Sequence, residues 1–220
     1  MELLRFAFVV VLMVVLAAAL VSFLLMGLSK ARRTRRLARL AHEQGRRFFR
    51  DDPYAVACRY AGFAMISCGH SPRAHNVTDG RLEGRPIRAF DFRCELGHGT
   101  RRVTRHFRVA AADLPAPPGD LLMWHDSDSE FAPLAARDSE GRLGAWNYRG
   151  RTDLAAAVAG ALGGADPPAS AVEVHGTTLM IAGRPRRGRD DYAVGGEELG
   201  VVVAAVAAAG APAPGPAGPR

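Results

Sequence analysis

The sequence predicts an α+β protein in which an N-terminal transmembrane helix precedes a domain with an antiparallel sheet and two C-terminal helices. Three observations support this prediction: an uncharged apolar run near the N-terminus, alternating apolar and polar residues over 76–114, and two alanine-rich apolar segments near the C-terminus. Together they divide the chain into four parts: an anchor (1–28), a basic juxtamembrane helix (29–50), an α+β cytoplasmic domain (51–209) and a disordered Ala/Pro/Gly tail (210–220).

The apolar run covers residues 6–28 and contains no charge over its 23 residues. As a helix it would be roughly 35 Å long, enough to cross a hydrocarbon core of about 30 Å. A cleavable signal peptide is the alternative, since the stretch at 17–20 resembles a cleavage site. Signal peptides have a shorter apolar core with positive charge in front of it, whereas here the positive charge follows. The pattern therefore favours a permanent anchor.

The stretch after this run carries nine basic residues and one acidic residue, Glu43, over 29–50. Positive residues beside a membrane helix stay on the cytoplasmic side. The other side offers only Arg5 and the terminal amine, partly offset by Glu2. The sequence therefore predicts a single-pass protein of the cell (inner) membrane, with the N-terminus outside and the C-terminal domain in the cytoplasm.

Within the basic stretch, apolar or neutral residues recur at helical spacing: Leu37, Leu40, Ala41, Gln44 and Phe48. A basic amphipathic helix of this kind can lie on anionic lipid, gaining about 1 kcal/mol from each nearby basic residue. The alternative is that the apolar side chains pack on the domain. In the first interpretation six residues contact the membrane surface: Lys30, Arg32, Arg33, Arg35, Arg36 and Arg39.

The basic character of the chain is confined to this stretch. The whole chain has a formal charge of +7 and a pI of about 10.1, but residues 51–220 hold 19 Arg against 20 Asp and Glu. A nucleic-acid-binding domain would carry its positive charge on the folded surface, so nucleic acid is not an expected partner. The expected partners are the lipid bilayer and other membrane or cytoplasmic proteins. Lys30 is the only lysine, which is typical of a GC-rich bacterial genome.

Residues 76–115 predict a three-stranded antiparallel meander with turns at 83–84 and 97–99. Pairing Glu95 with Arg102 gathers the large apolar side chains on one face, which a slip of one residue would mix. In that register Asp91 lies opposite His106 on the solvent-facing side, so the pKa of His106 should be raised. Two interpretations stay open: a surface pair of the sheet, or an acid–base couple.

The chain after the meander predicts shorter elements. Apolar runs bounded by Gly, Pro and Asp indicate strands and a hairpin, and Ala-rich runs indicate helices. The expected elements are strands at 120–126 and 143–150, a helix at 153–162, a hairpin at 171–183 and a helix at 197–209.

Three cysteines are too few, and odd in number, for a disulfide framework. Their apolar neighbours predict free thiols, with Cys58 and Cys68 as small core residues. A metal or histidine-based site could draw on Cys68, His70, His75 and His98, but the ligand spacing of a structural zinc site is missing. We therefore assign no catalytic, cofactor-binding or metal-ligating residue, and no cofactor is expected.

Several motifs recur in a recognisable order. The basic helix ends near Gly-Arg-Arg-Phe (45–48), a Gly-His-Ser step stands at 69–71, and Asn-Val, two glycines and Phe-Asp-Phe follow within 76–92. This layout resembles an uncharacterised family of bacterial single-pass membrane proteins of unknown function. The resemblance implies a membrane location and an α+β domain, and no mechanism.

Three functions remain open at this point. The favoured one is a membrane-tethered cytoplasmic interaction or scaffold module of unknown specific role, because the domain is neutral and no catalytic set is assembled. The alternatives are a small metal-dependent or histidine-based enzyme using Cys68, His70, His75 and His98, and a sensor of anionic lipid surfaces acting through residues 30–50. Enzyme activity is therefore less expected than binding.

Overall fold

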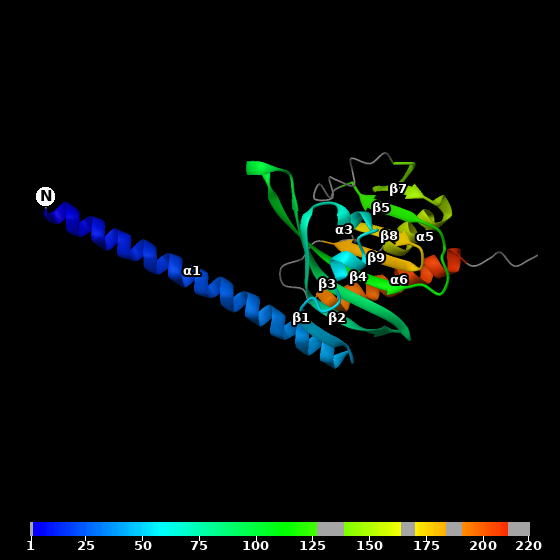
Figure 1. The fold of residues 1–220 in the computed structure, drawn as a ribbon, viewed down its shortest axis with the longest axis horizontal. Coiled ribbons are helices and arrows are strands. Elements are labelled where there is room, and N and C mark those ends of the chain that lie inside the picture. The colour runs from blue at the N-terminus through cyan, green and yellow to red at the C-terminus, as the bar shows by residue number, and fades with distance from the viewer. Residues whose placement is uncertain (1, 127–138, 164–169, 184–190, 211–220) are drawn as a thin grey trace, which may run out of the picture.

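The computed structural model describes residues 2–126, 139–163, 170–183 and 191–210. In these ranges the chain is an α+β protein with an N-terminal apolar helix and a nine-stranded antiparallel sheet, as the sequence predicted in outline (Figure 1). The strands lie in the order β1-β2-β3-β4-β9-β8-β5-β7-β6. Their bounds are β1 Arg47–Asp51, β2 His70–Leu82, β3 Arg85–Leu96, β4 Val103–Asp113, β5 Leu121–His125, β6 Gly141–Leu143, β7 Trp146–Gly150, β8 Ala171–His175 and β9 Thr178–Gly183.

The described ranges contain more helices than the sequence suggested. Thr152–Leu162 forms α5, close to its predicted bounds, and α6 begins at Asp191, six residues earlier than expected from the 197–209 pattern. Two short helices between β1 and β2 were not predicted, because apolar residues do not recur at a regular spacing over 54–75. The remaining helical segments are α1 Glu2–Glu43, α2 Val56–Arg59, α3 Ala64–Ser67 and the 3₁₀ turn η1 Gly99–Arg101.

The first helix, α1, runs unbroken from Glu2 to Glu43 and leaves the domain as a long rod (Figure 1). Its apolar part has a mean hydropathy of 3.1 and none of it is buried against the rest of the protein. This helix is therefore long and apolar enough to span a membrane.

The predicted end of the basic helix at residue 50 is wrong. The helix stops at Glu43, where Gly45 adopts a positive φ of 65° and the Arg46 N–H donates to the Ala41 carbonyl, a common helix termination. The next residues, Arg47–Asp51, form β1 and pair with β2. Helical periodicity did not reveal this change, because the pairing partner lies about 30 residues further along the chain.

The predicted meander is confirmed and is larger than expected, since β2 already begins at His70. Strand β9 pairs with β4 only over Arg108–Asp113. The far half of the β3–β4 hairpin therefore projects beyond the rest of the described sheet (Figure 1). Among the described strands, only the first residues of β2 accompany it there.

The predicted register of this hairpin is wrong by two residues. Asp91 lies opposite Arg108, and His106 lies opposite Arg93. The reason is the connection: η1 and two glycines with positive φ, Gly97 and Gly99, replace the tight turn that was expected. An even shift keeps every side chain on its predicted face, so the facial pattern alone could not exclude it.

The sheet is covered on both faces. On one face, α2 and α3 pack on a core that includes Phe90, Phe92 and Phe107. On the other, α5 and α6 pack on a second core that includes Leu154 and Val202. The end of α1 contacts α6 on this second side. A face that the sequence predicted to be solvated is therefore partly covered.

The short helix α3 is fixed by a carboxylate from β8. The backbone N–H groups of Ala64 and Met65 donate to the Glu173 oxygens at 2.7 and 3.1 Å, and Glu173 is buried. These N–H groups belong to the first turn of a helix and have no partner inside it. Glu173 therefore caps α3 from more than a hundred residues away.

Candidate functional site: the junction of the first helix with the sheet

One face of α1 docks on the domain near its C-terminal end. Arg33, Leu37 and Ala41 are spaced four residues apart and so lie along one side of the helix. Leu37 is 5% exposed and Ala41 is 3% exposed. This part of the helix therefore packs on the domain.

Asp91 lies at the centre of this junction, and its side chain is only 4% exposed. The Arg33 guanidinium of α1 donates to its Oδ1 at 3.0 Å, and the Asn76 amide of β2 donates to its Oδ2 at 2.7 Å. His75 Nε2 lies 3.8 Å from Oδ2, and Arg108 Nε of β4 lies 3.5 Å from Oδ1. The carboxylate is thus surrounded by groups from one helix and two neighbouring strands.

A bulge in β2 allows this arrangement. The pairing of β2 with β3 shifts between His75 and Thr78, and Asn76 within the shift has a φ of 49°. Asparagine adopts this left-handed conformation more readily than most residues. Bulges re-aim side chains in this way, and here the Asn76 amide is directed at Asp91.

The electrostatic role of the cluster follows from its burial. An isolated buried carboxylate is strongly disfavoured, whereas one that is paired and hydrogen-bonded is tolerated. Arg33 and Arg108 supply the opposite charge, and Arg33 is the one group of the four that comes from α1. Because the buried Asp91 carboxylate needs compensating charge, its ion pair with Arg33 helps to hold α1 on the sheet.

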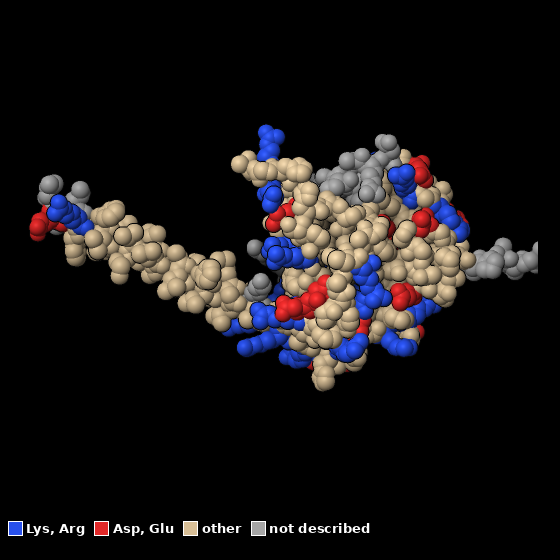
Figure 2. All heavy atoms as spheres, viewed as in Figure 1, with Lys and Arg blue, Asp and Glu red and all other residues tan. Residues whose placement is uncertain are grey.

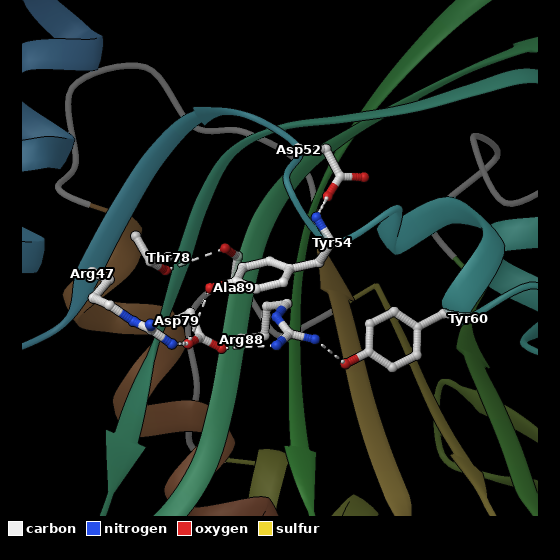
Figure 3. A network of polar contacts seen from close by, with 8 residues as sticks. All are labelled: Arg47, Asp52, Tyr54, Tyr60, Thr78, Asp79, Arg88 and Ala89. Atoms are coloured by element: carbon white, nitrogen blue, oxygen red, sulfur yellow. Dashed lines mark hydrogen bonds and ion pairs between the residues drawn. The ribbon is translucent and has the colours of Figure 1, made fainter.

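A second network ties β1 to the sheet (Figure 3). Asp79 of β2 accepts hydrogen bonds from Arg47 of β1 and from Arg88 of β3, the latter at 2.8 Å. The Arg88 guanidinium lies 4.3 Å from the centre of the Tyr54 ring and donates to the Tyr60 hydroxyl at 3.4 Å. The segment that directly follows α1 is thereby fixed to two strands and to α2.

This second network shifts the acidity of its carboxylate. Burial alone would raise the pKa of Asp79, but the hydrogen bonds and charges of Arg47 and Arg88 outweigh burial and hold that pKa below its ordinary value. Asp79 therefore stays ionised over the neutral range and keeps both arginines bound.

The residues considered for metal or histidine chemistry do not come together. The rings of His70 and His98 lie 4.9 Å apart beside the projecting hairpin, whereas His75 is turned toward Asp91. Cys68 donates to the Met65 carbonyl at 3.2 Å. In the part of the chain that the structure describes, no three His, Cys, Asp or Glu side chains are placed to share a metal ion.

The three cysteines are free thiols, but their environments differ from the prediction. Cys94 is fully buried and Cys68 is half-buried. Cys58 is exposed, so the prediction that it is a core residue is wrong. The reason is that α2 is a single turn, with Val56 facing the core and Cys58 facing away. A hydrogen bond with Cys68 and burial together raise the pKa of the Cys94 thiol.

The six basic residues expected at the membrane surface have different surroundings. Arg33 is bonded to Asp91, and Arg39 lies 3.6 Å from Glu43 one turn later. Arg32, Arg35 and Arg36 are exposed, and the side chain of Lys30 lies outside the described part of the chain. The Arg33–Asp91 pair was missed because the face of the meander that carries Asp91 was expected to be solvated.

Comparison with known proteins shows the fold and nothing more specific. No protein-family model matches the chain, and no curated protein matches it. A solved structure with a similar fold is that of the mycobacterial trehalose monomycolate transport factor A, TtfA, with a TM-score of 0.57 and 12% sequence identity. The match covers 79% of this chain and 94% of that one. At this identity the likeness concerns the fold alone.

Proposed function

We propose that this chain is a single-pass, membrane-tethered interaction or scaffold module whose α+β domain faces the cytoplasm. The observation that carries the proposal is the junction: α1 continues unbroken from its apolar part into the domain and is bonded there to the buried Asp91. A domain held in this way presents any bound partner at a fixed position relative to the bilayer.

The orientation rests on charge. Nine basic residues follow the apolar run, and few precede it, which favours a cytoplasmic domain. A phosphatase fused after residue 220 should therefore be inactive, and a fluorescent protein at the same place should be bright. An active phosphatase there would contradict the orientation.

The class of process is suggested by the fold comparison. The similar structure is that of a protein titled a transport factor, so we propose that this chain takes part in a transport process at the membrane.

The test is crosslinking of the full chain in native membranes, followed by purification and identification of what is attached. A defined membrane protein should be recovered. Recovery should fall in Arg33→Gln, which loosens the domain from α1, and stay unchanged in Arg35→Gln, an exposed residue two positions away. Equal recovery with both variants would show that the junction has no part in partner binding.

A further inference from the structure

The junction sets the depth of the sheet relative to the proposed bilayer. The apolar run ends at Leu28, and Arg33 is bonded to Asp91 only a turn and a half further on, about 7.5 Å along the helix axis. The headgroup region on each side of a hydrocarbon core is roughly 5–8 Å thick. The face of the sheet that carries Asp91 therefore lies at about the level of lipid headgroups, provided that α1 spans the membrane as proposed.

The next row of this face toward the hairpin end is basic across three strands. Arg73 of β2 pairs with Arg93 of β3, which pairs in turn with His106 of β4. Arg73 and Arg93 are like charges directly opposite each other, an arrangement that destabilises a sheet. In the described residues, Nε of Arg93 is buried and has no hydrogen-bond acceptor. An anion bound at the exposed side of this face would therefore stabilise the Arg73–Arg93 pair.

The neighbouring carboxylates already have other partners. Asp91, one row away, is held by the four groups of the junction. Glu95, on the other side of the row, is paired with Arg102 at 3.2 Å. The charge of this row is therefore not compensated by these two acids.

The projecting hairpin adds further exposed basic residues at its end. Arg101 and Arg102 lie at η1, next to Val103, which is 46% exposed. The hairpin extends on the same side of the domain as the apolar part of α1 (Figure 1), and Figure 2 shows Lys and Arg atoms at its end and along this side. Exposed arginines beside an exposed apolar side chain are typical of membrane-surface contacts.

We propose that the hairpin surface, which we define as Arg73, Arg93, Arg101 and Val103, binds the phosphate groups of anionic phospholipids in the membrane that holds α1. Phosphate oxygens accept charge-assisted hydrogen bonds from guanidinium groups and remove the repulsion along the row. Each basic residue near an anionic surface favours the bound state about fivefold. The domain thus contacts the bilayer both through the basic stretch that follows the apolar run and through the hairpin surface. Only the contact of the basic stretch is predictable from the sequence. This inference rests on the membrane tether of the proposed function.

The full chain in lipid nanodiscs provides the test. Thr100→Trp places an indole at the exposed end of the hairpin, whereas the native Trp124 and Trp146 are 3% and 7% exposed. Its fluorescence should shift to the blue and be quenched by nitroxide-labelled lipid in discs containing phosphatidylglycerol, and much less in discs of phosphatidylcholine alone. Inorganic phosphate at matched ionic strength should not reverse the quenching.

Charge variants in the same background identify the contact. The exposed pair Arg73→Gln and Arg101→Gln should lower the ratio of docked to undocked hairpin roughly 25-fold, and Arg93→Gln about fivefold. The matched control removes two arginines at the distant β6–β7 edge, Arg142→Gln and Arg149→Gln, and should leave the quenching unchanged. Circular dichroism checks that each variant is folded.

The inference would be overturned by equal quenching in both kinds of disc or by quenching unaffected by loss of Arg73 and Arg101. Release by free phosphate would also overturn it, because it indicates a small-anion site. Protection of the hairpin only when a protein partner is added would also contradict it. If the proposed tether itself fails, the chain does not enter the discs at all. Failure of the hairpin contact leaves the chain in the disc with an unquenched indole, so the two failures are distinguishable.

Discussion

The guanidinium of Arg33 lies 3.0 Å from the carboxylate of Asp91, although 58 residues separate them in the sequence. The pair joins the long helix to β3, an inner strand of the sheet. The Asp91 side chain is 4% exposed and that of Arg33 is 43% exposed. Because water screens the exposed Arg33, the pair contributes to the position of the helix as much as to the free energy of unfolding. Together with the buried side chains of Leu37 and Ala41, it holds one face of the helix against the domain.

Removing the buried partner should destabilise the domain. Asp91→Ala leaves Arg108 and Asn76 facing each other without the carboxylate, and we expect a loss of about 2–4 kcal/mol in the free energy of unfolding. Glu95→Ala on the same strand, whose partner Arg102 is exposed, should cost less than about 1 kcal/mol. Chemical denaturation of the two variants provides the comparison, and equal losses would argue against a structural role for Asp91.

Asp79 should contribute to the loss of folding stability in acid. Its pKa is lower in the folded than in the unfolded protein, so its ionised form stabilises the fold fully above the unfolded pKa of about 3.9. This contribution, up to about 1 kcal/mol because Arg47 is exposed, is lost as the pH falls from there through the lower folded value.

Asp79→Asn should therefore weaken the protein at neutral pH and converge with the natural protein in acid. Urea unfolding between about pH 2 and pH 6 measures both curves. Asp113→Asn, at an exposed strand end, serves as the control. Parallel curves for Asp79→Asn and the natural protein over the whole range would disprove the assignment.

Glu173 should be the most costly single carboxylate to truncate on the side of the sheet that α3 covers. Glu173→Ala leaves the N–H groups of Ala64 and Met65 buried without acceptors, and we expect a loss of about 2–4 kcal/mol. Glu173→Gln keeps one acceptor oxygen and should lose about half as much. Thermal unfolding measures both, and the absence of any difference between them would show that the cap is unimportant.

The cysteines should differ sharply in reactivity. Cys58 is exposed, whereas the hydrogen bond with Cys68 and burial raise the pKa of Cys94 and keep it a protonated thiol. Maleimide labelling followed by mass spectrometry should modify Cys58 first and Cys94 only after denaturation. Cys58→Ser is the control that removes the fast reaction. Rapid labelling of Cys94 in the folded protein would show that its burial is transient.

The parts of the fold that follow from local periodicity were predictable. Alternation along Phe90, Phe92 and Phe107 predicted the meander and the face of each side chain. The register was not predictable, because a shift of two residues changes no face and is decided by the 3₁₀ turn at Gly99–Arg101. The end of the first helix depended on the pairing of Phe48 with Thr78, a contact between distant residues.

The junction could not be predicted for a related reason. Asp91 alternates with Phe90 and Phe92 as a surface residue would, and its burial depends on α1 and on the bulge at Asn76. One indication was present in the sequence: Leu37 and Ala41 lie on the same helical face as Arg33, so an apolar pair and a charge point in one direction. That pattern fits a helix docked on a polar patch.

The order of strands in the sheet has a consequence for synthesis. Among the described strands, β4 is the fourth to be made, but its second neighbour, β9, is the last. The ribosome adds about 5–20 residues per second, so the Ala-rich edge of β4 stays unpaired for several seconds while β5 to β8 are made. An open strand edge of this kind is prone to pair with other chains. Because α1, the proposed membrane helix, is made first, neighbouring nascent chains in the same membrane would be the nearest source of such mispairing. The yield of native protein should then fall as the expression level is raised.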